Sequence, residues 1–388
     1  MRILLLSQGR KIEDQISFHT AFKNSTVDGS PVELRNIPFI GFIEQFGLPA
    51  FYDEVLRVNR EFAPDVVMFQ ACHWRPLKDP SSCILALRNA ANHPLIFGTC
   101  GDLFQPYYGH MWVRKPFKPM TIIATMADAF FMTQMGRLAE YLVSKGAKNI
   151  VHLPNVLLDS QFPGWDTQLP DERDFDVVML GSARKFSVRD PFSSYFHYRR
   201  RLETVNALWK RYGKRFGLFG PGWNHPAAQG AVPFGDQIRV FQRSRIVVDS
   251  RPPYPEMYYA SNRSHQIAGS GAALVQYYTP RFDKMFRPGN NADFVYDQSQ
   301  LISTCDNLLM KDPAALAVRA AETRQLMRER HLRIHRCDTI LSVAQAIRAI
   351  RSGRVSLAEG KNIVRLHQFL PDVDLTAEKE FAMSNWLG

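Results

Sequence analysis

Short apolar runs that recur between helical segments are the sequence feature that most constrains the fold. In the first half they are RILLLS (2–7), DVVMFQ (65–70), HPLIFGT (93–99), DAFFMTQ (128–134) and NIVHLPN (149–155). Consecutive apolar positions are typical of parallel strands that are buried on both faces of a sheet. Segments of helical pattern separate them, for example MGRLAEYLVSKGA. This alternation predicts a doubly wound parallel sheet.

A second series of the same kind follows residue 173. Its runs are FDVVMLGS (175–182), FGLFGPGW (216–223), SRIVVDS (244–250), AALVQYY (272–278) and ADFVYD (292–297). Helices are expected near 194–213, 301–311 and 313–351, the last with a break. A chain of 388 residues suits two domains. We expect an N-terminal domain over 1–165, a C-terminal domain over 166–345, and a helical tail over 346–388 that can pack back on the first domain. The aperiodic segment 157–173 is the expected linker.

Composition excludes several classes of protein. Hydrophobic residues make up 45% and charged residues 22%, which is the balance of a globular protein. No apolar run approaches the roughly 18 residues of a membrane span, so we expect a soluble, cytoplasmic protein. The five cysteines form no C-x-x-C pair, so neither a zinc site nor a disulfide framework is expected. Walker, H-E-x-x-H, G-x-S-x-G, G-x-G-x-x-G and helix-turn-helix patterns are all missing from the sequence.

Positive charge is concentrated in one segment. The net charge is +11, and the segment from Arg184 to Arg215 contains ten Lys or Arg residues but only two acidic residues. Such a segment attracts phosphates, whether of a nucleotide, a nucleic acid or a lipid head group. A solvated helix face would have the same composition, so this signal alone does not select a ligand.

The stretch SNRSHQIAGSGAALVQYY (261–278) places Arg263 and His265 before two glycines and a buried strand. Basic side chains at a glycine-rich corner can form the wall of an anion site. Glycine permits positive φ or a close backbone approach, and both serve structure as often as ligand binding. The glycines considered for such roles are Gly181, Gly220, Gly222, Gly269 and Gly271. Trp223 can stack on a base or cover the core.

These motifs resemble a known family. DVVMLGSARK, GLFGPGW and NRSHQIAGSGAALVQYYTPRFDKMFRPGNNADFVYD are similar to the C-terminal domain of nucleotide-sugar glycosyltransferases of GT-B fold, in particular the spore-maturation (CgeB-like) branch. LIFGTCGDLF and GAKNIVHLPNVLLDSQF resemble parts of the first domain more loosely. The resemblance covers roughly residues 60–345. It implies two Rossmann-like domains that face each other across a cleft.

The resemblance also implies roles for single residues. Arg263 stands where the family carries a phosphate-binding arginine, and Gln266 stands where many members carry a glutamate that binds the ribose. Arg184 and Lys185 follow the Gly181 turn, where they would meet a phosphate. Gly220, Trp223, Gly269 and Gly271 complete the implied donor site. The implied donor is a nucleotide-sugar, with a UDP-sugar expected, and neither a metal nor another cofactor is implied.

The acceptor hydroxyl of an inverting enzyme needs a base. Asp102 follows the strand LIFGTCG and can serve as this base or cap the next helix. His73, just past DVVMFQ, is the second candidate. A retaining enzyme would need no such base, and both outcomes stay open.

Three functions compete. The first is sugar transfer to a hydroxyl of a small molecule, glycan or protein. The second is transfer to a hydroxylated DNA base, which the net charge of +11 favours. The third is a non-catalytic sugar-nucleotide-binding protein, which Gln266 favours because an amide loses the charge-assisted hydrogen bonds of a carboxylate.

Overall fold

The computed structural model describes residues 1–70, 77–101, 118–167, 170, 172–183, 191–249, 257–365 and 383–384. By their contacts these residues form two compact units, the first from 1–154 and 333–388 and the second from 155–332. The chain therefore passes between the units at Pro154/Asn155 and again at Leu332/Arg333. Both points come earlier than the expected domain boundaries at 165 and 345.

The first unit contains a sheet with strand order β15-β8-β7-β6-β5-β1-β4. Its strands are β1 (Arg2–Ser7), β4 (Glu33–Pro38), β5 (Val66–Phe69), β6 (Leu95–Cys100), β7 (Ala129–Met132), β8 (Ile150–His152) and β15 (Met383–Ser384). All pairs are parallel except β15 with β8. A small antiparallel pair joins β2 (Thr26–Val27) to β3 (Ser30–Pro31).

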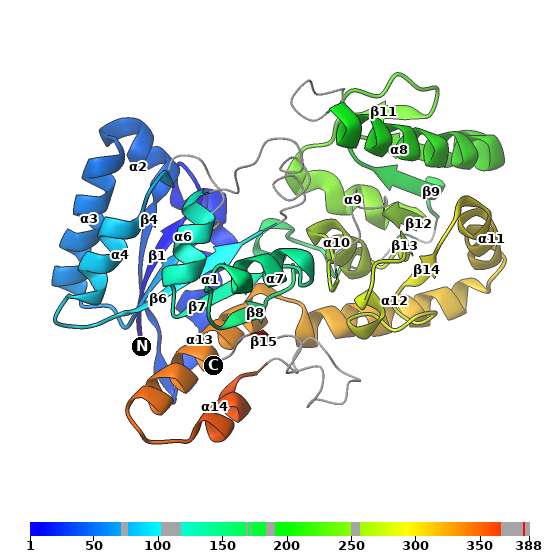
Figure 1. Cartoon of the computed structure of the whole chain (residues 1–388). Coiled ribbons are helices and arrows are strands. Elements are labelled where there is room, and N and C mark those ends of the chain that lie inside the picture. Colours follow the sequence, from blue (N-terminus) through cyan, green and yellow to red (C-terminus); the bar gives the residue numbers. More distant parts are fainter. Residues whose placement is uncertain are drawn as a thin grey trace. The chain divides into compact units, whose positions relative to one another are not determined.

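Eight described helices belong to the first unit. They are α1 (Ile16–Asn24), α2 (Phe39–Phe46), α3 (Leu48–Phe62), α4 (Ser81–Arg88), α6 (Lys118–Met126), α7 (Arg137–Ser144), α13 (Arg333–Arg351) and α14 (Leu357–Ile363). Figure 1 shows α13 and α14, in orange and red, packed with the early part of the chain. Helix α13 contacts α1, and β15 pairs with β8, so the end of the chain returns to the unit that its beginning forms.

The second unit contains a fully parallel sheet with strand order β11-β10-β9-β12-β13-β14. Its strands are β9 (Phe175–Leu180), β10 (Phe216–Phe219), β11 (Ala228–Gly230), β12 (Ser244–Asp249), β13 (Ala273–Tyr277) and β14 (Asp293–Val295). Its helices are α8 (Pro191–Tyr212), α9 (Gln237–Gln242), α10 (Asn262–Ser270), α11 (Gln298–Leu309) and α12 (Pro313–Arg330). The strand cores are buried, as their continuous apolar runs require.

The segment expected to be a linker packs inside the second unit. Phe162 and Trp165 are buried, and Leu157 donates its N–H to the carbonyl of His331 at 2.9 Å. Residues 157–167 of the expected linker therefore belong to the second unit, and their buried apolar side chains help to form its core. His331 and Leu332 also interrupt the predicted long helix 313–351, at the point where the chain leaves this unit.

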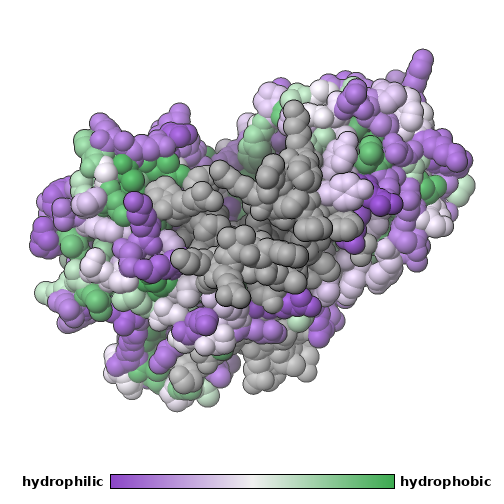
Figure 2. Space-filling view, turned by 45° about the horizontal axis from the view of Figure 1, so that its top comes forward, coloured by the Kyte–Doolittle hydropathy of each residue, from purple (hydrophilic) through white to green (hydrophobic). Residues whose placement is uncertain are grey.

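The described surface mixes residue types. In the view of Figure 2, hydrophilic residues in purple are interspersed with hydrophobic residues in green. Across the described residues, no helix is both long and apolar enough to cross a membrane.

Candidate active site

The carboxyl ends of β9, β10 and β12 lie at one edge of the second sheet, where parallel α/β sheets bind ligands. Gly181 follows β9, Gly220 follows β10, and Asp249 ends β12. The helix α10, which carries Arg263 and Gln266, begins after β12 in the chain. The described members of the expected donor site therefore come from neighbouring elements of one unit.

The turn after β9 is held by two side chains. Trp223 Nε1 donates a hydrogen bond to the carbonyl of Gly181 at 2.6 Å, and Arg201 Nη1 donates to the carbonyl of Ser182 at 2.8 Å. The N–H of Gly181 donates to the carbonyl of Phe219 at the end of β10, and the N–H of Ala183 donates to the carbonyl of Pro221 just after it. The turn is therefore fixed before any ligand binds, and two of its N–H groups are already engaged.

Trp223 belongs to the wall of this turn. Its ring packs against the core of the second unit and is stacked with Tyr198 at a centroid distance of 6.3 Å. Of the two interpretations left open by the sequence, these contacts support the packing role.

Gly220 allows β9 and β10 to end close together. Its φ is +128°, and a Cβ built on it would lie 2.3 Å from the carbonyl oxygen of Gly181. A side chain at this position would therefore collide with rigid backbone.

Arg263 lies on the first turn of α10 and forms an ion pair with Asp249. Its Nη1 is 3.4 Å from Oδ1 of Asp249, whose side chain is buried, while the arginine side chain as a whole is 27% exposed. The Arg263 Nε is buried and has no hydrogen-bond partner among the described residues. One end of this guanidinium is thus anchored, while its Nε–H still lacks an acceptor.

Asp249 also organises the start of α10. Its Oδ2 accepts hydrogen bonds from Ser261 Oγ at 2.8 Å and from Ser264 Oγ at 2.7 Å. Ser264 Oγ lies 2.9 Å from Oε1 of Gln276 on β13. Ser261 is the N-cap of α10 and accepts the Ser264 N–H. A buried carboxylate therefore already occupies part of the positive end of this helix.

Gln266 lies one turn further along α10 and is 1% exposed. Its Oε1 is buried without a partner among the described residues. Unsatisfied buried acceptors are uncommon in folded proteins, so this oxygen has an acceptor capacity that the described residues do not use.

Packing and backbone conformation at the C-terminal end of α10 explain why glycine occupies positions 269 and 271. A Cβ on Gly269 would lie 2.8 Å from the side chain of Leu157, and Gly271 has the left-handed φ of +85° that ends α10. Arg324 of α12 donates to the carbonyls of Gly269 and Ser270 at 3.0 and 2.6 Å. This end of α10 is closely packed and capped.

The consecutive arginines of α8 have different surroundings, some at the exposed surface and one beside the turn that follows β9. Arg199 forms an exposed pair with Glu203, whereas Arg201 contacts the β9 turn. Arg201 and Tyr277 help to line a cavity of about 210 Å³ near the carboxyl end of β13.

Four of the expected site residues lie outside the described residues. They are His73, Asp102, Arg184 and Lys185. Within the described part of the chain, no group of three or more His, Cys, Asp and Glu could hold a metal ion.

Asp249, Ser264 and Arg324 were not predicted from the sequence. Asp249 had a usable signal, because an acid directly after an apolar strand is the pattern that singled out Asp102. Ser264 and Arg324 had none, since their partners lie on other elements.

One protein-family model matches part of the chain. Residues 199–342 match a family model described as glycosyl transferase-like, which includes most of the second unit. No curated protein sequence is significantly similar to the chain.

Several solved structures are similar over almost the whole chain. Sucrose-phosphate synthase from Thermosynechococcus elongatus shares 13% identity over 91% of this chain and 100% of that chain, with a TM-score of 0.57. The Anabaena protein HepE in complex with UDP and glucose shares 12% identity over 91% and 100%, with a TM-score of 0.52. An alpha-glucosyltransferase in complex with UDP and a 13-mer DNA containing an A:G mismatch shares 12% identity over 85% and 96%, with a TM-score of 0.55.

The chain has the GT-B fold. The expected pair of Rossmann-like domains with parallel sheets is confirmed, with the antiparallel β15 added at one edge.

Proposed function

We propose that this protein is a glycosyltransferase that moves a sugar from a nucleotide-sugar donor to a hydroxyl acceptor. The glycosyl transferase-like match over 199–342 carries the proposal, because it covers the elements that hold Arg263 and Gln266. The fold alone would not suffice, since one fold can host unrelated activities.

In this proposal the donor binds at the carboxyl edge of the second sheet. Departure of the nucleoside diphosphate leaves negative charge, which a guanidinium stabilises. Asp249 holds Nη1 of Arg263, so the unsatisfied Nε–H is the group that we assign to a phosphate oxygen. Gln266 Oε1, which also lacks a hydrogen-bond partner among the described residues, is assigned to a ribose hydroxyl.

UDP is the proposed nucleotide, supported by the UDP complexes of two solved structures with the same fold. The reaction is proposed to need no metal, with basic side chains in its place. Asp102 is the proposed acceptor base, with His73 as the second candidate, because each comes just after a predicted strand of the first domain. The resemblance to the CgeB-like branch is part of the same proposal.

Binding can be tested by titration calorimetry of the full chain with UDP, GDP, ADP and CMP, with EDTA and then with Mg²⁺. We expect UDP to bind in EDTA and Arg263→Ala to weaken it at least about tenfold, because a charge-assisted hydrogen bond is lost. Arg239→Ala is the matched control, since this arginine of α9 is exposed and pairs only with Asp236 among the described residues. Failure of all four nucleotides to bind would refute the proposal.

Turnover is then measured as release of the nucleoside diphosphate from its sugar conjugates in the presence of candidate acceptors. Release that depends on an acceptor supports transfer. Tight binding without release from any conjugate would favour a non-catalytic binding protein.

A DNA acceptor is the second candidate. The net charge of +11 and the DNA complex of one structure with this fold favour it. Duplex DNA with hydroxymethylated bases should then stimulate release, and the logarithm of the binding constant should fall linearly with that of the salt concentration. No stimulation by this DNA would contradict the candidate.

A further inference from the structure

A cavity of about 540 Å³ lies at the opposite edge of the second sheet, where the strands begin. Arg173 precedes β9, Arg245 is near the start of β12, and Ala273 begins β13. Gly271, which ends α10, also lines the cavity. The cavity is therefore separate from the proposed donor site, which is at the carboxyl ends of the strands and the first turn of α10. Gly271, which the resemblance assigned to the donor site, lies at this opposite edge instead.

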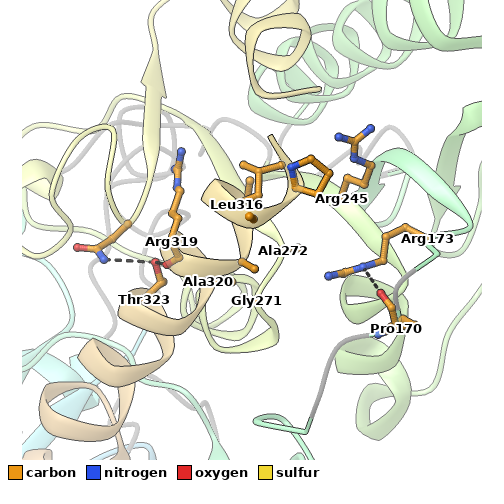
Figure 3. Close-up of a pocket in the computed structure, with 14 residues that line it drawn as sticks. Pro170, Arg173, Arg245, Gly271, Ala272, Leu316, Arg319, Ala320 and Thr323 are labelled. Carbon is orange, nitrogen blue, oxygen red and sulfur yellow. Dashed lines mark hydrogen bonds between the residues drawn. The ribbon is translucent and has the colours of Figure 1, made fainter. Parts of the chain in front are cut away.

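One wall of this cavity is apolar. It consists of Ala272, Ala273, Pro313, Leu316, Ala317 and Ala320. Figure 3 shows Leu316 and Ala320 of α12 on one side of the hollow, with Arg173 and Arg245 across from them. A volume of this size lies within the range of small-molecule pockets.

The side across from α12 is basic through Arg173 and Arg245, and Arg319 extends from α12 itself (Figure 3). Among the described residues that line the cavity, three are arginines and none is acidic. Arg173 donates only to the backbone carbonyls of Pro170, Gln242 and Ser244, and it forms no ion pair with a described residue. Burial and the nearby charge of Arg245 lower the pKa of Arg173, which is the expected effect of a cation without an anionic partner.

The other two arginines are only partly neutralised. Arg245 lies 4.0 Å from Asp176, and that carboxylate also pairs with Arg215 at 2.9 Å. Arg319 donates from Nη2 to Asp293 at 2.6 Å, while its buried Nη1 has no partner among the described residues. Arg319 is only 9% exposed, so this donor lacks solvent as a substitute.

We infer that this cavity is a second binding site for a small amphiphilic anion, with a carboxylate or phosphate against the arginines and an apolar body against α12. The amino terminus of α12 is already capped by Asp312, whose carboxylate accepts the Ala314 N–H. The guanidinium groups are therefore the partners of the anion. Displacing water from the alanine and leucine wall favours the apolar part of the ligand.

Titration calorimetry of the full chain with 2-naphthoate, 1-naphthyl phosphate and the neutral 2-naphthalenemethanol tests this inference. At least one anion should bind with one-to-one stoichiometry, and the alcohol should bind at least about tenfold more weakly, because it lacks charge-assisted hydrogen bonds. The preferred anion distinguishes a carboxylate ligand from a phosphate ligand.

Two variants locate the binding. Arg245→Gln should weaken binding of the anion about tenfold, because it removes one positive charge from the cavity. Ala317→Phe should weaken it by filling the cavity, and Ala317 is exposed, so folding should tolerate the change. Arg239→Gln on the exposed face of α9 is the matched control and should bind like the wild type.

Cooperative thermal unfolding of each variant confirms that it is folded. The inference is overturned if neither anion saturates the protein, or if binding persists unchanged in both cavity variants. It does not rest on the proposed function, because the probes contain no nucleotide and the variants leave Arg263 unchanged.

Discussion

Nη1 of Arg263 lies 3.4 Å from Oδ1 of Asp249, so a buried carboxylate at the end of β12 holds a guanidinium on the first turn of α10. The same carboxylate accepts the hydroxyl hydrogens of Ser261 and Ser264. The arginine that the sequence motif assigns to a phosphate is thus positioned by an acid that lies outside that motif.

Asp249→Asn should destabilise the folded protein by about 1–3 kcal/mol, because buried hydrogen-bonding groups lose a charged acceptor. Urea denaturation followed by circular dichroism measures this change. Glu203→Gln is the control, since its pair with Arg199 is exposed and should contribute little. Equal and small effects of the two substitutions would contradict the structural role of Asp249.

Gly220→Ala should be more destabilising than Gly213→Ala by at least about 2 kcal/mol, because only the first adds an atom against rigid backbone. Both glycines have positive φ, but the added Cβ lies 2.3 Å from the Gly181 carbonyl oxygen at Gly220 and meets nothing within 4 Å at Gly213. The free energies of unfolding from urea titrations provide the comparison. Similar losses would mean that backbone strain alone explains the glycine at 220.

His152 should make stability fall in mild acid. Burial, assisted by the charge of Arg336, lowers its pKa to about 3, and the imidazole is fully buried. In the unfolded chain this imidazole binds a proton near pH 6.5, whereas in the folded chain it stays neutral. The stability associated with the neutral His152 is therefore fully present above pH 6.5 and is lost progressively as the pH falls toward 3. Between pH 6.5 and 4.5 we expect a loss on the order of 2 kcal/mol from this group.

The control for this effect is His152→Gln, which removes the titrating group. Free energies of unfolding at several pH values should show a shallower decline for this variant than for the wild type. Parallel curves would show that other groups cause the acid sensitivity.

Much of the architecture followed from local sequence patterns. The run RILLLS predicted β1 (Arg2–Ser7), and FDVVMLGS predicted β9 (Phe175–Leu180), because strands buried on both faces need consecutive apolar residues. The strand β4 (Glu33–Pro38) was missed, since its exposed edge position permits polar residues such as Glu33 and Arg35.

The candidate site was predictable only in part. Arg263 and Gln266 were identified through a motif that is contiguous in the chain. The contacts of Asp249 with α10 and of Arg324 with Gly269 were not, because each joins residues on separate elements. Pro, Gly and Asp around Phe162 and Trp165 indicated a linker, but the burial of the two rings was not predictable, because it depends on residues remote in the chain.

By itself, the sequence determined that this chain forms two α/β units, because the apolar periodicity that marks each helix and strand is a local property. Tertiary structure decided which strands became neighbours, and therefore which charges met. Arg263 acquired a buried carboxylate partner, while Arg173 and Arg245 came together beside an apolar wall. The different surroundings of these arginines depend on burial and on contacts between residues remote in the chain, and a local sequence pattern does not specify either.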